Sequence, residues 1–290
     1  SGRMPLLVNG ICEAARPAFC CALSADCKKK LLVIVSDEKD AYKISAGIGA
    51  YNDRVLVFPV RDFVFDPISA RSRDFEHERL SVLSRLLSDE VDIIVTVPDA
   101  VMQYTMPRSV LAASRIRLVR GEKSDIGEVT AALLSMGYSR TELVEGPGQF
   151  SLRGGILDVY SPGCAYPCRV DYFGDEIDLL GLFDTVSQRR FENVGEYVCI
   201  PADEVLFSPA ALERTADAAQ KLLPRCADDK SRALVTDEYA AALDGIAPAA
   251  YDRYFSLVYE EKETLLSYMG DSITLIFESP RVSDRVKAFT

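Results

Sequence analysis

Short apolar runs separated by helical patterns constrain the fold of this chain more than any other feature of its sequence. The runs at 31–35, 54–58 and 91–97 have the length and composition of strands that are buried on both faces. Helical patterns lie between them, at 37–51 and at 75–87, the second with leucines spaced along one face. Strand and helix in alternation predict a parallel sheet with right-handed crossovers. The first third of the chain therefore predicts an α/β domain.

The pattern changes after about residue 114. Polar and apolar residues alternate over 116–119, and a helix is expected over 125–136, ended by Gly137. From 148 to 180 the alternation has period two and is punctuated by Gly-Gly, Pro-Gly and Gly-Asp pairs. Such punctuation is typical of antiparallel hairpins. A second domain, of the α+β class, is therefore expected here.

Helical composition returns towards the end of the chain, at 209–223, 231–243 and 253–268. One more strand of the buried type is expected at 272–277. A lone strand after an α+β block suggests a return to the first sheet, which would make the first domain discontinuous and the middle domain an insertion. The predicted boundaries are 1–115, 116–203 and 204–290.

Composition excludes several classes of function. The net charge is -11, whereas a protein that wraps duplex DNA normally presents a basic surface. No apolar run approaches the roughly 20 residues that cross a bilayer, so we expect no membrane association and a cytoplasmic location. With a single histidine, schemes that pair histidine with a nucleophile mostly fail, and no catalytic residue is expected.

Metal binding is not expected either. Cys164 and Cys168 are separated by three residues, but they lack the paired spacing of a structural zinc site, and the eight cysteines are interpreted as free thiols. His77 is expected on a solvated helical face between two glutamates. Asp175 and Glu176 are interpreted as a turn residue and the first residue of a strand, rather than as an acid–base pair.

Three segments carry more specific identities. They are Gly-Gln-Phe-Ser-Leu-Arg-Gly-Gly-Ile-Leu-Asp-Val-Tyr at 148–160, Tyr-Pro-Cys-Arg-Val-Asp-Tyr-Phe-Gly-Asp-Glu-Ile-Asp at 166–178, and Phe-Asp-Thr-Val-Ser-Gln-Arg at 183–189. They resemble the UvrA-interacting domain shared by UvrB and the transcription-repair coupling factor family, Mfd. The order of the segments at 58–59, 74–83 and 91–97 extends the resemblance over nearly the whole chain.

The resemblance implies a fold. A degenerate P-loop-type parallel sheet domain is expected, discontinuous in sequence, with the α+β UvrA-interaction domain inserted in it. The range 1–115 would be subdomain 1a, 116–203 the interaction domain, and 204–290 subdomain 1b.

Two features make the resemblance one to Mfd rather than to UvrB. UvrB has a phosphate loop of the form G-x-x-x-x-G-K-[ST]. The corresponding stretch here, 9–16, has one glycine, Gly10, no Gly-Lys-Ser/Thr, and the acidic Glu13 where phosphates would lie. ATP binding should therefore be lost. UvrB also inserts a tyrosine-rich hairpin that probes DNA, whereas 59–75 is short here and contains no tyrosine.

The resemblance places the UvrA contacts on Arg153, Arg169 and Phe173. Arg169, Asp171 and Phe173 alternate along one strand and so should face the same side. Arginine beside an aromatic residue is typical of an interface hot spot.

Two alternatives remain open for these residues. Arg153 could form an internal salt bridge with Asp158 or Asp171 instead of contacting a partner. Phe173 could belong to the core, in which case Val170 and Tyr172 would face outwards.

The resemblance implies a UvrA-recruiting, UvrB-mimicking module in transcription-coupled nucleotide excision repair. The resemblance assigns binding of RNA polymerase and DNA, and ATP-driven translocation, to other domains of the family that are absent here. No cofactor and no enzyme activity are therefore expected of this fragment. It is also expected to be a monomer. The rival hypotheses are a UvrB-type ATPase fragment and a damaged-DNA-binding module. ATP-dependent thermal stabilisation would favour the first, and salt-sensitive DNA binding the second.

Overall fold

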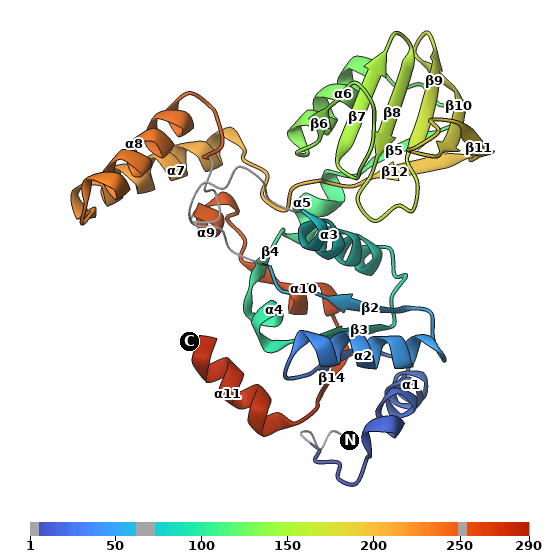
Figure 1. Cartoon of the computed structure of the whole chain (residues 1–290), viewed down its shortest axis with the longest axis vertical. Coiled ribbons are helices and arrows are strands. Elements are labelled where there is room, and N and C mark those ends of the chain that lie inside the picture. The colour runs from blue at the N-terminus through green and yellow to red at the C-terminus, as the bar shows by residue number, and fades with distance from the viewer. Residues whose placement is uncertain (1–5, 62–72, 249–253, 290) are drawn as a thin grey trace. The chain divides into compact units, whose positions relative to one another are not determined.

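The computed structural model describes residues 6–61, 73–248 and 254–289 (Figure 1). It divides into two compact units, each built from separate stretches of the chain. Unit 1 takes residues 1–60, 85–103 and 265–290, and unit 2 takes 61–84 and 104–264. The two units cut the chain differently from the three predicted ranges, which stay a prediction.

Unit 1 contains a four-stranded, wholly parallel sheet in the order β14-β1-β3-β2, so the predicted parallel sheet is confirmed. The central strand β1 has Leu31, Leu32 and Val33 fully buried. The elements of this unit are η1 (Glu13–Ala15), α1 (Arg16–Cys27), β1 (Lys30–Ile34), α2 (Glu38–Gly49), β2 (Val55–Phe58), β3 (Ile93–Thr96), α4 (Pro98–Met102), α10 (Leu265–Met269), β14 (Ser272–Ile276) and α11 (Ser279–Phe289).

Local chemistry explains where the helices of unit 1 begin and how closely they pack. The side chain of Asp37 caps α2 by accepting a hydrogen bond from the backbone N–H of Asp40 at 2.9 Å. Pro17 lies in the first turn of α1, where its missing N–H costs nothing. Gly47 of α2 lies against Pro17, and a Cβ on this glycine would come within 2.6 Å of the proline ring. A small residue at 47 therefore sets the spacing of α1 and α2.

Strand β14 pairs in parallel with β1 from Ser272 to Ile276, which is the return to the first sheet that the sequence predicts. The expectation of a buried strand is wrong, however. β14 is the edge strand of the sheet, and its side chains are half-buried or exposed. An apolar run in the sequence does not distinguish an edge strand from a central one, because both are rich in branched residues.

Unit 2 contains a six-stranded sheet in the order β11-β10-β9-β8-β7-β6, antiparallel except between β6 and β7. The predicted hairpins are therefore confirmed. One core cluster joins this sheet to α6 and to the β5–β12 pair, around Leu118, Leu133 and Phe150. The elements are β4 (Tyr104–Thr105), α5 (Arg108–Ala113), β5 (Ile116–Val119), α6 (Ile126–Ser135), β6 (Ser139–Arg140), β7 (Gln149–Arg153), β8 (Ile156–Tyr160), β9 (Cys168–Phe173), β10 (Glu176–Phe183), β11 (Arg190–Asn193) and β12 (Glu196–Cys199).

The last part of unit 2 is helical. It comprises α7 (Pro209–Leu222), η2 (Leu223–Arg225), α8 (Asp229–Leu243), α9 (Phe255–Val258) and β13 (Glu263–Thr264). The first two predicted helices of this region are confirmed, but a single helix over 253–268 is wrong. The chain becomes extended at Tyr259, whose buried hydroxyl donates to the carbonyl of Glu204 and accepts from the N–H of Leu206, both at 2.9 Å. None of the described helices combines the length and apolar character needed to cross a membrane.

A buried ion network ties α3 (Asp74–Leu87) to the segment that follows β12. Arg79 is fully buried and donates from Nε and Nη2 to the two carboxylate oxygens of Glu204, at 3.0 and 3.1 Å. Arg61 approaches the same carboxylate at 3.5 Å, and Glu76 accepts a hydrogen bond from the backbone N–H of Glu204 at 2.8 Å. A bidentate arginine donates two parallel, charge-assisted hydrogen bonds to a carboxylate, which makes the pair strong. The network therefore fixes α3 within unit 2.

His77 is buried on α3 rather than solvated, so that part of the sequence interpretation is wrong. Its ring lies 3.3 Å from the position that a Cβ on Gly148 would occupy, and Gly148 has a φ of +78°. Burial is the main cause that lowers the pKa of His77. Nearby, Asp203 pairs with Arg73 at 2.6 Å and lies so close to Gly137 that no side chain fits there. A helical pattern in sequence cannot reveal that a polar residue will pack against a segment distant in sequence.

Asp203 provides a test of this packing. Burial raises the pKa of its carboxyl to about 6, above that of an unfolded aspartate, so folding takes up a proton between these values and stability rises as the pH falls through this window. In Asp203→Asn this contribution is absent. The free energy of unfolding of the variant, relative to the wild type, should fall by about 1 kcal/mol between pH 7 and pH 5. His77 is present in both proteins, so its opposite titration cancels in the difference. Urea unfolding followed by circular dichroism measures it, and a pH-independent difference would contradict the assignment.

Candidate functional site

Strand β9 divides its side chains between two faces of the six-stranded sheet. Val170 and Tyr172 pack on the core cluster, whereas Arg169, Asp171 and Phe173 lie on the opposite face. The predicted placement of these three residues on one side is therefore confirmed. The alternative in which Val170 and Tyr172 face outwards is wrong. We call the side of the sheet that carries Arg169, Asp171 and Phe173 the polar face.

Asp158 of β8 lies at the centre of the polar face and is 1% exposed. It stands directly opposite Arg169 in the β8–β9 register. Arg169 donates from Nε and Nη2 to its two oxygens at 2.6 and 2.9 Å, and Arg153 of β7 donates from Nη2 at 2.5 Å. Two strands thus converge on one buried carboxylate. Of the two internal partners that the sequence leaves open for Arg153, the structure has Asp158.

The two arginines differ in how far they are committed inside the domain. Arg169 is 19% exposed, lies over the ring of Phe183 at 4.8 Å, and donates from Nη1 to the carbonyl of Gln188 at 3.2 Å. The hydrogen bond to Asp158 raises the pKa of Arg169 further above its ordinary value. Arg153 is 46% exposed. Arg153 can therefore reach a partner more easily, while Arg169 is mainly part of the domain's own packing.

Phe173, at the end of β9, is 84% exposed, so the alternative that places it in the core is wrong. Gly174 follows with a φ of +65° and forms a tight turn with Asp175 before β10 begins at Glu176. The interpretation of Asp175 and Glu176 as turn and strand residues is confirmed. Lys123 pairs with Asp175 at 3.3 Å. The turn therefore holds an unshielded phenyl ring at the margin of the polar face.

Two loops close over part of the polar face. In the loop 141–148, the carbonyl of Glu142 accepts from the hydroxyl of Ser151 at 2.9 Å, and Val144 is fully buried. Gln188, in the turn 184–189, donates from Nε2 to the carbonyl of Val144 at 3.2 Å. The loops cover the side of the face near Arg169 and Phe183, and they leave Arg153 and Phe173 accessible.

Sequence reasoning missed a second ion pair on this face. Arg190 of β11 donates from Nη2 to Oδ1 of Asp171 at 2.5 Å. Its side chain crosses β10 above Gly181, where a Cβ would lie 2.8 Å from Cδ of the arginine. No pattern in 190–193 signals a strand, so only the fold reveals the pair. Asp158 carried a weak signal, since it occupies the polar phase of an otherwise apolar strand.

The degenerate phosphate loop has no confirmation here. The stretch 9–16 runs through irregular backbone into η1 and α1, and residues 6–12 contain no strand that would precede a phosphate loop. Gly10 has a φ of +87°, and Glu13 pairs with Lys43 at 3.4 Å. A degenerate nucleotide site at this place stays a prediction. Most of 59–75, where the second contrast with UvrB was drawn, lies outside the described residues.

The thiols offer no metal site. Within the described ranges, no group of three or more histidine, cysteine, aspartate or glutamate side chains is arranged to hold a metal ion. Cys164 is half-buried and Cys168 buried, and both are free. Burial raises the pKa of the Cys168 thiol to about 12, which keeps it protonated and unreactive at neutral pH.

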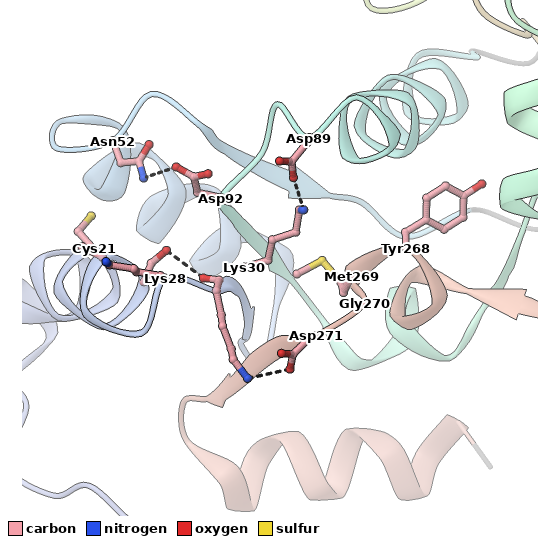
Figure 2. Close-up of a pocket in the computed structure, with 13 residues that line it drawn as sticks. Cys21, Lys28, Lys30, Asn52, Asp89, Asp92, Tyr268, Met269, Gly270 and Asp271 are labelled. Atoms are coloured by element: carbon pink, nitrogen blue, oxygen red, sulfur yellow. Dashed lines mark hydrogen bonds and ion pairs between the residues drawn. The ribbon is translucent and has the colours of Figure 1, made fainter.

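Unit 1 has a polar hollow of about 680 Å³ at the edge of the sheet where its strands begin (Figure 2). Lys29 pairs with Asp271 at 2.8 Å, and Lys30 pairs with Asp89. Asp92, on a third side, accepts from Asn52 at 3.4 Å and pairs with Arg54 at 2.9 Å. The ion pairs link the starts of β1, β3 and β14. Of the charged side chains that line the hollow, all except Lys28 belong to these ion pairs.

Comparison with known proteins decides the nature of the middle domain. The family model described as the UvrB interaction domain matches residues 116–205, which hold the polar face. Residues 116–205 are therefore similar to the UvrB interaction domain. The chain is also 27% identical over 282 residues to the transcription-repair-coupling factor of Bacillus subtilis, and 26% identical over 301 residues to that of Staphylococcus haemolyticus.

These alignments cover 94% and 100% of this chain but 24% and 26% of the two relatives. The chain thus spans about a quarter of the length of the curated relatives that it matches. The resemblance to the UvrB-like module of transcription-repair coupling factors is confirmed. The matched stretch, 116–205, lies within unit 2, and its six-stranded sheet carries the residues that the resemblance singles out.

The convergence on Asp158 predicts a large effect on stability. Asp158→Asn keeps the shape but removes the charge that answers Arg153 and Arg169, so it should lower the free energy of unfolding by about 2 kcal/mol. Urea unfolding followed by circular dichroism gives this value. The matched control is Asp175→Asn, which removes an exposed pair and should change stability by less than about 0.5 kcal/mol. Equal effects of the two substitutions would show that the buried carboxylate is not a structural centre.

Proposed function

We propose that this chain acts in transcription-coupled repair as a module that recruits UvrA by presenting a UvrB-like surface. The observation that carries the proposal is the polar face of the UvrB interaction domain, with Phe173 exposed beside arginines that Asp158 holds in place. The similarity to transcription-repair-coupling factors over nearly the whole chain supports the pathway. UvrA itself is an inference from the domain's family.

The chemistry of this face suits protein binding. A phenyl ring that is 84% exposed has lost little water on folding, so covering it with a partner yields most of the hydrophobic gain. Arg153, half-exposed and already oriented by Asp158, gives up little side-chain entropy when it binds a carboxylate. An aromatic anchor next to an oriented arginine is the composition found at interface hot spots. Phe173 therefore acts in binding without being needed for folding, whereas Arg153 both binds and stabilises Asp158.

Phe173 provides the cleanest test. Phe173→Ala should weaken binding of the chain to purified UvrA about thirty-fold, a loss of about 2 kcal/mol, because the anchor of the interface is removed. Its melting temperature should stay close to that of the wild type, since an exposed side chain contributes little to stability. Isothermal titration calorimetry measures the dissociation constant.

The matched control for this experiment is Leu134→Ala. Leu134 is an exposed apolar residue on α6 of the same domain. It should bind UvrA as the wild type does. Equal affinities of wild type, Phe173→Ala and Leu134→Ala would refute the assignment of the polar face, and a wild-type chain that does not bind UvrA would refute the function.

We propose further that this fragment is not an enzyme and that it binds no ATP. Glu13 adds negative charge in the stretch 9–16, and no lysine of a phosphate loop is present there. The matched stretch is about a quarter of each relative, and we assign ATP-driven translocation and the engagement of RNA polymerase and DNA to their remaining length.

Nucleotide binding can be tested directly. A ligand that binds only the folded state at a hundred times its dissociation constant stabilises it by about 2.7 kcal/mol, which raises the melting temperature by several degrees. Millimolar ATP with Mg²⁺ should therefore leave the melting temperature of this chain unchanged in differential scanning fluorimetry. A rise that depends on ATP concentration would favour the rival ATPase fragment.

A further inference from the structure

Arg190 is the third arginine on the polar face, and it comes from a strand that the resemblance does not single out. It starts on β11, crosses β10, and reaches Asp171 on β9. Asp171 stands two residues from Arg169 and two from Phe173 on the same strand and the same face. The guanidinium of Arg190 therefore lies next to the residues proposed to bind UvrA.

Gly181 makes this crossing possible. A Cβ at this position would lie 2.8 Å from Cδ of Arg190, closer than real Cβ contacts come, and 3.0 Å from its Nε. Gly181 has an ordinary backbone conformation, so its lack of a side chain is what matters rather than a left-handed φ. The pair Gly181 and Arg190 thus extends the polar face across β10 to the edge of the sheet.

The two carboxylates of the polar face are bound to different degrees. Asp158 is 1% exposed and receives three hydrogen bonds from two arginines. The side chain of Asp171 is 29% exposed and receives one hydrogen bond, from Arg190, whose side chain is 25% exposed. Displacing Arg153 and Arg169 from Asp158 would leave a buried charge unpaired, which is costly. Water already reaches Asp171, so breaking its ion pair with Arg190 costs far less free energy.

The polar face carries three guanidiniums, those of Arg153, Arg169 and Arg190, on a chain whose net charge is -11. A guanidinium that can leave its internal partner fits a partner surface that presents carboxylates. Only one of the two pairs is free enough to open for such a group.

We propose that Arg190 is a further binding residue of the polar face, and that it exchanges Asp171 for a carboxylate of the partner. This proposal rests on the proposed function and names the chemistry that the partner presents at this site. Arg190 is paired with a carboxylate both before and after the exchange, so its charge is neutralised in both states. A carboxylate can also accept two hydrogen bonds from one guanidinium. Asp171 orients the guanidinium in the free chain, and it is released to water when the partner binds.

The test is a double-substitution cycle on this chain with purified UvrA in isothermal titration calorimetry. Arg190→Ala should weaken binding about ten-fold and lessen its dependence on salt, because one guanidinium of the interface is lost. Asp171→Asn should leave the affinity unchanged or raise it up to about five-fold, since the competing charge is removed. In the double variant, the substitution at 171 should have no further effect, because Arg190 is no longer there to be competed for.

Arg117→Ala is the matched control. Arg117 lies on β5 of the same domain and forms an exposed ion pair with Glu196 at 2.6 Å, which is not part of the polar face. It should bind as the wild type does. Circular dichroism melting shows whether each variant is folded, and Asp171→Asn still decides the matter where Arg190→Ala is unstable.

Two results would overturn the exchange while leaving the proposed function intact. One is an affinity of Arg190→Ala within about two-fold of wild type while Phe173→Ala loses binding. The other is a loss of about five-fold or more in Asp171→Asn, which would make Asp171 itself a contact. If neither Phe173→Ala nor Arg190→Ala alters binding, the proposed polar face fails as a whole.

Discussion

The carboxylate of Asp158 is the interaction on which the polar face depends. A charge that is 1% exposed is stable only when hydrogen-bond donors surround it, and Arg153 and Arg169 supply them from the two neighbouring strands. Asp158 in turn holds each arginine in a single orientation. What a partner would meet is therefore a set of guanidiniums whose positions are fixed before binding. Fixing them within the fold removes much of the entropy loss that flexible arginines would suffer at an interface.

The rest of the polar face is arranged around that centre by backbone features. The turn at Gly174 holds Phe173 out of the core, and Gly181 opens a path for Arg190 across β10. The loops 141–148 and 184–189 cover the ring of Phe183 and Arg169, and Gln188 joins the two loops by its hydrogen bond to Val144. Covering part of the face and leaving Phe173 exposed distinguishes residues that stabilise the domain from residues that remain to bind.

Part of this could be predicted from the sequence, and the reasons differ from element to element. Period-two alternation placed Arg169, Asp171 and Phe173 on one side, because side-chain direction in a strand depends only on parity. It could not show that Asp158 pairs with Arg169, since that follows from the register between β8 and β9. The burial of His77 depends on a neighbour distant in sequence, Gly148, and was predicted wrongly. β14 read as a buried strand because its apolar run carries no mark of its edge position.

Burial of the carboxylate separates the ion pairs of unit 2 into two kinds. Glu204 is fully buried and receives a bidentate arginine, as Asp158 receives two arginines, and in both places a carboxylate organises segments distant in sequence. Asp171 differs from both, because water still reaches it and it pairs with a single arginine through one hydrogen bond. A buried carboxylate fixes structure because opening its pair leaves a charge without solvent, whereas a half-exposed one can release its arginine to a competitor. Burial of the acid, rather than the presence of arginine, therefore decides which ion pairs hold the domain together and which can serve recognition.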